Sequence, residues 1–302
     1  MRNAQIIHNP SSGGGNHAKQ KIIEAIEKEG YRVEYISTKN ENAWKNYKPS
    51  KEGNIFVAGG DGTVTKMAER LLHQNPEHNV LLHILPYGTA NNIAKMIDIS
   101  TSVESGLIND EKNTKSFDCG QILGGPKEFF FESFGFGVFP ELISQMKKVD
   151  TPNRPSEKLK QSLKVLLDIV ENFKSKKISF EADGSIIEDS FILVELMNIQ
   201  NLGPNLPLAA NADPGDGYFD LVLIHEDKRS EFLDFLTEMV AGIKKKQKLD
   251  TFTKIFRVQN MQMKCRGQKF HIDDNVFDDF SSDKLQIKIW HNCLEFARNE
   301  FQ

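Results

Sequence analysis

The sequence predicts an N-terminal α/β domain with a doubly wound, mostly parallel sheet, followed by a C-terminal antiparallel β-sandwich domain. Over about the first 100 residues, short apolar runs alternate with segments of helical spacing, which is typical of a parallel sheet with right-handed crossovers. From about Lys115 onward, apolar residues alternate in short segments, which indicates antiparallel strands. A chain of 302 residues is long enough to form two such cores.

The first half is expected to repeat a unit of strand, loop and helix. Each expected strand is a short apolar or alternating run, and each expected helix has apolar residues three and four positions apart. The expected strands are 5–8, 31–37, 54–58 and 80–85, and the helical spacing begins at Ala18, Val64 and Ile93.

The second half is expected to be rich in β-strands, with two helices inserted. Apolar residues recur at helical spacing over 156–174 and again over 230–243. The change of pattern places one domain over residues 1–120 and the other over residues 121–290.

Charge and cysteine usage exclude several classes of protein. Lys and Arg total 38 against 42 Asp and Glu, a net charge of −4, so no overall positive field exists to hold a nucleic acid. The three cysteines are far apart and odd in number, which argues against a disulfide framework and a thiolate zinc site. The N-terminal apolar run is too short for a secretory signal, and no stretch reaches the length of a membrane span. We therefore expect a cytoplasmic protein.

Three glycine-containing loops stand where an expected strand leads into a helix, at 9–15, 59–63 and 87–91. Backbone amides bind phosphate best where side chains are absent and a helix N-terminus is electropositive. In a parallel sheet all three loops would lie at the carboxyl edge, where open α/β folds bind ligands. One such loop is as readily a tight turn, but three together favour a nucleotide site.

Five sequence motifs resemble those of the diacylglycerol kinase catalytic-domain family. GGDGT at 59–63 resembles the signature shared by diacylglycerol, sphingosine and NAD kinases and by phosphofructokinases. LPYGTANNIA at 85–94 resembles the LPxGTxND(F/L)A motif of the diacylglycerol kinases, and NPSSGG at 9–14 resembles their opening NPxSG. DCG at 118–120 and LAANADPGDGYFDLVLI at 208–224 resemble two later segments.

The resemblance implies an ATP-dependent lipid kinase that phosphorylates the hydroxyl of diacylglycerol or a similar lipid. It implies an ATP-binding domain over 1–120, a lipid-substrate domain over 121–290, and a C-terminal segment, about 291–302, that packs back onto the first domain. The residues that it implies for the nucleotide are Asn9, Pro10, Ser11, Ser12, Gly13, Thr38, Gly59, Gly60, Asp61, Gly62, Thr63, Thr89 and Asn91.

Phosphoryl transfer to an alcohol needs a base near the hydroxyl and magnesium with the nucleotide. The resemblance aligns Asp273, in the string FHIDDN, with the family's catalytic aspartate, and leaves Asp274 as the fallback. The sequence departs from the family here, because Asp274 stands where relatives have Gly and Asn275 where they often have Glu. By turn chemistry alone, the two aspartates would be solvated residues of a hairpin.

Two further segments concern metal and substrate. The resemblance implies a structural Mg²⁺ held by Asp213, Asp216 and Tyr218, although a plain β-turn before a strand is the alternative. Asp61 is expected to join the nucleotide network or to organise magnesium, with a loop-capping role as the alternative. The stretch 198–207 departs from the family's NGxxxGGG pattern.

The expected partners are ATP with Mg²⁺ and a lipid at a membrane surface, with no nucleic acid and with a homodimer left open. The basic amphipathic helix over 156–174 could rest transiently on an anionic membrane, or its apolar stripe could pack on the β-domain. The alternatives to a diacylglycerol kinase are a kinase of a sphingoid base or NAD, and a non-catalytic relative that binds nucleotide or lipid.

Overall fold

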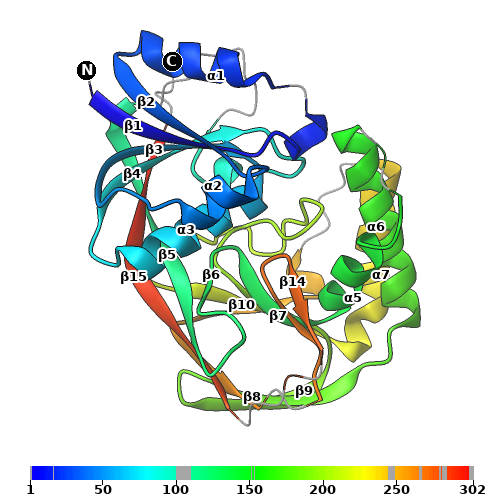
Figure 1. Cartoon of the computed structure of the whole chain (residues 1–302). Helices are drawn as coiled ribbons and strands as arrows, with labels where there is room; N and C mark the ends of the chain where they lie inside the picture. The colour runs from blue at the N-terminus through cyan, green and yellow to red at the C-terminus, as the bar shows by residue number, and fades with distance from the viewer. Residues whose placement is uncertain are drawn as a thin grey trace. The chain divides into compact units, whose positions relative to one another are not determined.

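The chain forms two compact units. The computed structural model describes residues 2–15, 17–99, 110–150, 152, 154–243, 249–264, 267–278, 280 and 284–298. One unit comprises Met1–Phe117 with Asn292–Gln302, and the other comprises Asp118–His291. Strands β5 (Asp110–Leu123) and β15 (Leu285–Arg298) each contribute residues to both units (Figure 1).

The first unit is built on a parallel sheet, as the sequence predicts. Its strands are, in order, β2 (Tyr31–Ser37), β1 (Arg2–His8), β3 (Glu52–Gly59), β4 (Asn79–Pro86) and the end of β15. Its helices are α1 (Lys19–Lys28), α2 (Glu41–Asn46), α3 (Asp61–Gln74) and α4 (Asn92–Met96), with a short 3₁₀ turn η1 (Ser12–Gly14). Glu295 of β15 pairs with Leu81 of β4, so part of the C-terminal strand joins this sheet; residues 299–302 lie outside the described residues.

The second unit is an antiparallel β-sandwich with helices, which confirms the predicted fold class. Its main run of strands is β14 (Asn275–Phe277), β13 (Phe270–Ile272), β7 (Ser133–Gly137), β9 (Ser185–Met197), β8 (Lys176–Ala182), β12 (Asn260–Met263) and the start of β15. Strand β10 (Phe219–His225) pairs with β9 and with β11 (Lys254–Val258), and β6 (Phe129–Phe130) pairs with β5. The helices are α5 (Val138–Met146), α6 (Pro155–Asn172) and α7 (Arg229–Ala241), with 3₁₀ turns η2 (Glu226–Lys228) and η3 (Leu249–Thr251).

Strand β9 is buried on both faces along its second half, which explains its continuous apolar run. Val194 and Leu196 belong to an apolar cluster within the sheets, whereas Leu193 and Met197 belong to a second cluster that includes residues of α5, α6 and α7. Each such buried side chain contributes roughly 1.5–3 kcal/mol of hydrophobic free energy. The single charged residue in this half of the strand, Glu195, is therefore enclosed by apolar neighbours.

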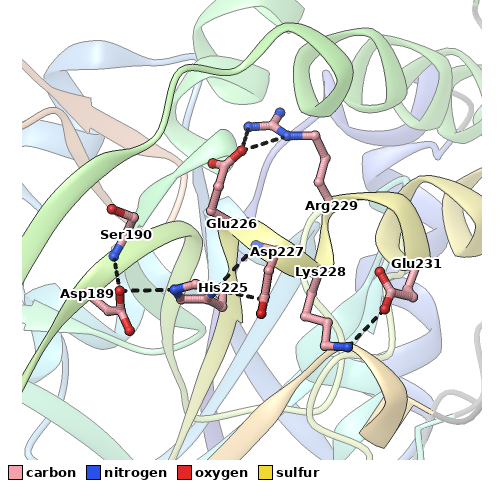
Figure 2. A network of polar contacts seen from close by, with 8 residues as sticks. All are labelled: Asp189, Ser190, His225, Glu226, Asp227, Lys228, Arg229 and Glu231. Carbon is pink, nitrogen blue, oxygen red and sulfur yellow. Dashed lines mark hydrogen bonds and ion pairs between the residues drawn. The ribbon is translucent and has the colours of Figure 1, made fainter.

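Arg229 at the start of α7 fastens the end of α6. Its guanidinium donates to the carbonyl oxygens of Val170 and Phe173, the latter at 2.6 Å. It also pairs with Glu226 at 2.7 Å, as Figure 2 shows. The terminal carbonyls of a helix otherwise lack partners, so these bonds close the C-terminus of α6. The contact joins α6 and α7, which pack side by side in Figure 1.

The apolar stripe of α6 packs into the core of the second unit. Leu163, Leu166 and Val170 are buried in the same cluster as residues of α5 and α7. The structure therefore favours the packing interpretation of this stripe over membrane contact. None of the helices in the described ranges is long and apolar enough to cross a bilayer.

Candidate active site

The first glycine loop contacts the other two at the carboxyl edge of the parallel sheet. Asn9 follows β1, and its Nδ2 donates to the Thr63 hydroxyl at 3.2 Å. Gly13 has a φ of +54°, and a Cβ there would lie 2.1 Å from the carbonyl oxygen of Tyr87. Only glycine combines this backbone conformation with so close an approach.

The second and third loops touch through two glycines. A Cβ on Gly60 would lie 2.8 Å from Cα of Gly88, and a Cβ on Gly88 would lie 2.4 Å from Cα of Gly60. The backbones can meet only because both side chains are absent. The N-terminus of α3 begins at this contact, and phosphate groups favour a helix N-terminus.

Asp61 caps the short helix α4. Its Oδ2 accepts from the backbone N–H of Asn92 and its Oδ1 accepts from that of Ile93, both at 3.0 Å. Burial lowers the pKa of Lys95, and the Asp61 carboxylate opposes this shift. The loop-capping alternative for Asp61 is therefore what the structure describes, and its part in binding magnesium stays a prediction.

Asn91 closes the third loop from within. This buried residue has a φ of +51°, its Nδ2 donates to the carbonyls of Pro86 and Gly88, and its Oδ1 accepts from Gly88 N–H at 2.8 Å. Asparagine tolerates the left-handed region better than most residues. Asn91 therefore shapes the loop, and a direct contact with nucleotide stays a prediction.

The remaining residues predicted for the nucleotide lie at the same edge. Pro10, Ser11 and Ser12 form the turn after β1, Gly59 ends β3, Gly62 and Thr63 lie in the first turn of α3, and Thr89 lies in the third loop. Thr38 follows β2, and its N–H donates to the His8 carbonyl at 2.9 Å. The structure thus brings together all three loops and the end of β2.

Two histidines beside the first loop were not predicted. His8 Nε2 lies 2.7 Å from His17 Nδ1, and His17 Nε2 lies 2.9 Å from the Ser12 carbonyl oxygen. The His17 ring stacks on Tyr87 with 4.4 Å between centroids. Burial, assisted by His17, lowers the pKa of His8 to about 4. His8 is therefore neutral at physiological pH and holds the loop by hydrogen bonding.

In the second unit, Asp273 lies in the two-residue turn between β13 and β14. Its backbone has a φ of +47°, and only 7% of its surface is exposed, whereas Asp274 is exposed. The positive φ falls on Asp273, so the residue after it does not need to be glycine. The interpretation of both aspartates as solvated hairpin residues is wrong for Asp273.

Three consecutive backbone amides hold the Asp273 carboxylate. Its Oδ1 accepts from the N–H groups of Phe131, Glu132 and Ser133 at 3.1, 2.8 and 3.3 Å. Its Oδ2 accepts from Phe131 at 3.2 Å. Burial raises the pKa of Asp273 to about 6, and the backbone bond from Glu132 and the charge of Lys127 oppose this shift. The carboxylate is thus ionised at neutral pH with a pKa close to it.

Asn198 supports the segment that supplies these amides. Its Nδ2 donates to the carbonyl oxygens of Phe131 and Asp118, both at 2.9 Å, and its own N–H donates to the Glu132 carbonyl at 3.0 Å. The stretch 198–207 departs from the family pattern, yet the asparagine that it keeps secures the Asp273 cradle. Backbone donors have no residue signature, so the sequence could not reveal the amides themselves.

The residues predicted for a structural magnesium are engaged in other contacts. Asp216 Oδ1 accepts from Tyr218 N–H at 3.0 Å, and its Oδ2 pairs with Arg257 Nη2 at 2.5 Å. The Arg257 guanidinium also lies 4.2 Å from the centre of the Tyr218 ring, and Asp213 Oδ1 accepts from Gly215 N–H. These contacts do not fit a magnesium site, because a side-chain cation already neutralises Asp216. Among the described residues, no group of three or more His, Cys, Asp or Glu side chains could hold a metal.

We therefore expect a chelator to leave the thermal stability of the protein unchanged, within about 2 °C. The measurement is the unfolding midpoint with EDTA and with excess MgCl₂. Arg257→Gln should lower the midpoint because Asp216 loses its partner, whereas Lys254→Gln, at an exposed residue of the same strand, should not. A fall of several degrees with EDTA that Mg²⁺ restores would instead place a metal at this segment.

A parallel sheet whose glycine loops meet at its carboxyl edge, and a sandwich that holds a buried acid, are the features expected of a nucleotide-dependent phosphotransferase. Residues 3–122 match the diacylglycerol kinase catalytic domain, and residues 145–273 match the YegS C-terminal NAD kinase beta sandwich-like domain. The two matches cover most of the chain, which belongs to the diacylglycerol kinase and YegS-like lipid kinase family.

Individual relatives agree with this family. The chain is 24% identical to the diacylglycerol kinase of Bacillus subtilis (strain 168), over 89% of this chain and 90% of that protein. It is 24% identical to a diacylglycerol kinase of Mycobacterium tuberculosis (strain ATCC 25618 / H37Rv), over 72% and 69% of the two chains. A crystal structure of a diacylglycerol kinase from Bacillus anthracis str. Sterne has a TM-score of 0.70 at 16% identity, covering 99% of this chain and 97% of that one. That likeness shows the shared fold.

Proposed function

We propose that this protein transfers the terminal phosphoryl group of ATP to the hydroxyl of diacylglycerol or a similar lipid, with Asp273 as the general base. The observation that carries the proposal is the buried Asp273 carboxylate, held by backbone amides and with its pKa raised to about 6. A base works best when its pKa lies near the operating pH, because it is then ionised and still accepts a proton readily. The lipid acceptor is suggested by the family.

The nucleotide is proposed to bind the three loops of the first unit. The glycines at 13, 60 and 88 let the three loops come together, because a Cβ at any of them would lie 2.8 Å or less from the backbone of a neighbouring loop. The N-terminus of α3, at this contact, favours anionic groups. Mg-ATP, when bound, supplies the phosphoryl group and the cation that neutralises its charge. The chain's part is to hold the phosphates through Asn9, Thr63 and the loop amides.

Oδ2 of Asp273 is the proposed proton acceptor. Among the described contacts, Oδ1 accepts three N–H bonds, whereas Oδ2 accepts one at 3.2 Å. Oδ2 therefore keeps more of its lone-pair density for the hydroxyl proton of the lipid. The amides hold Oδ1 and fix the direction of the carboxyl group, so the proton moves to one defined atom.

The pH dependence of catalysis should report this carboxylate. We expect kcat/KM to fall with decreasing pH through about pH 6, because protonated Asp273 cannot accept the hydroxyl proton. Above that pH the ionised form dominates and the profile should level off. The measurement is kcat/KM for the lipid from pH 4.5 to 8.5 at saturating Mg-ATP. An acidic limb near the ordinary pKa of an aspartate, about 4, would contradict a buried base.

The direct test is transfer of labelled phosphate from Mg-ATP to diacylglycerol in mixed micelles, with sphingosine and NAD as parallel acceptors. We expect label in phosphatidic acid. Label in sphingosine phosphate or NADP would keep the fold and change the substrate, which corresponds to the sphingoid-base and NAD alternatives. ATP binding without transfer to any acceptor would favour a non-catalytic nucleotide-binding relative.

A further inference from the structure

A buried polar row crosses three strands next to Asp273. Gly135 of β7 pairs in register with Glu195 of β9 on one side and with His271 of β13 on the other. Glu195 and His271 are 0% and 1% exposed, and His271 Nε2 lies 2.9 and 3.0 Å from the two Glu195 carboxylate oxygens. A Cβ on Gly135 would lie 2.2 to 2.3 Å from the Glu195 carboxylate. Glycine at this position lets Glu195 reach across the middle strand.

The other ring nitrogen of His271 links this row to Asp273. Nδ1 lies 2.9 Å from the main-chain carbonyl oxygen of Asp273. A carbonyl oxygen can only accept, so Nδ1 carries a hydrogen. Burial by itself would lower the pKa of His271, but the Glu195 carboxylate, together with the backbone and the charge of Asp273, raises it. The ring is therefore held between a carboxylate and the backbone of the proposed base.

Asp273 has an uncommon backbone conformation. Its φ of +47° falls in the left-handed region, which non-glycine residues adopt at a cost that the surroundings must offset. Asp273 N–H donates to the Ser133 carbonyl at 2.9 Å on one side, and His271 donates to the Asp273 carbonyl on the other. The two bonds fix both peptide groups that flank the Asp273 side chain.

We propose that Glu195 and His271 are positioning residues, which hold the Asp273 peptide so that its carboxylate stays in the cradle formed by the Phe131–Ser133 amides. This inference rests on the proposed function of Asp273. Packing alone does not require such a pair, because apolar residues of similar volume are often equally stable in place of a buried ion pair. Glu195, the single charged residue in the apolar second half of β9, was the sequence signal that could have revealed it.

The test separates the two bonds of His271 with amide side chains. Asn places its amide nitrogen where Nδ1 lies, so it can keep the bond to the Asp273 carbonyl; Gln extends to the position of Nε2 and loses that bond. Glu195→Gln is made first, because it removes the buried charge while the neutral ring can still bond at both nitrogens. The proteins compared are E195Q, E195Q/H271N and E195Q/H271Q, together with the natural chain.

Two readouts report the position of Asp273. One is the NMR titration of its ¹³C-labelled carboxyl group, assigned by Asp273→Asn; the other is kcat against KM in the lipid assay. In E195Q/H271Q we expect the titration to move down by at least about one pH unit, because burial is the main cause of the raised pKa. We also expect kcat to fall about tenfold or more relative to E195Q/H271N, with the KM for ATP unchanged. Lys127 and Asp274, the other charges acting on Asp273, are the same in all the proteins.

The results distinguish a positioning role of Glu195 and His271 from a purely structural role. Equal titration and equal kcat in the Asn and Gln variants, with lower thermal stability in both, would reduce the pair to a structural role and overturn the inference. If the titration responds as expected but even the natural chain phosphorylates no lipid, the positioning stands and the proposed function fails. If E195Q/H271Q does not fold, His271→Gln alone, which keeps its contact with Glu195, takes its place in the comparison.

Discussion

Replacing Asp273 with asparagine is expected to lower lipid phosphorylation at least about a hundredfold, the scale of losing a general base. Asparagine matches the carboxylate in size, adopts positive φ readily, and can still accept from the cradle amides through its oxygen. It cannot take up the hydroxyl proton. ATP binding should survive, because the glycine loops lie in the other unit. The measurements are kcat/KM for the lipid and ATP affinity by calorimetry.

Asp274→Asn is the matched control for this prediction. Asp274 is exposed, and the hydrogen bond that Lys147 donates to it, at 3.1 Å, goes to its main-chain carbonyl and not to its side chain. The substitution should therefore leave turnover and folding nearly unchanged. Near-normal turnover in Asp273→Asn would remove the base assignment. A large loss in Asp274→Asn in the same experiment would transfer the role to that residue.

Gly60→Val is expected to abolish measurable ATP binding. Gly60 has φ −98° and ψ −175°, an extended conformation that valine also adopts, so the effect comes from space and not from backbone strain. A Cβ at this position already lies 2.8 Å from Cα of Gly88, and the valine methyl groups add to the overlap. The second and third loops must then separate, which displaces the amides proposed to hold the phosphates.

The measurement for Gly60→Val is calorimetric ATP affinity, with thermal unfolding to show that the protein remains folded. Overpacking of this kind typically costs about 1–3 kcal/mol of stability, so a folded variant is expected. Lys66→Ala, an exposed position on the same helix α3, controls for unrelated changes and should bind ATP normally. Unchanged affinity in Gly60→Val would exclude the second loop from the nucleotide site.

Local chemistry explains why so much of the first unit was predictable. A turn between a strand and a helix is specified by residues that are adjacent in the sequence, often glycines. The loops at 9–15, 59–63 and 87–91 could therefore be located from the sequence. The structure joins them through pairs such as Gly60 and Gly88, which the sequence could place only at the same edge of the sheet. Asp61 was expected to join the nucleotide network or to organise magnesium, with capping as the alternative, and the bonds from Asn92 and Ile93 show that it caps α4.

The second unit depended more on contacts between distant parts of the chain. The sequence by itself determined the fold class, the glycine loops and Asp273 as the candidate base, because these follow from periodicity, turn residues and motif resemblance. The tertiary structure decided the environment of each candidate. Asp273 meets the Phe131 amide 142 residues away, and Asp216 meets Arg257 41 residues away. Burial raises the pKa of Asp273, and Arg257 neutralises the charge of Asp216. Both effects depend on segments that come together only when the sheets form.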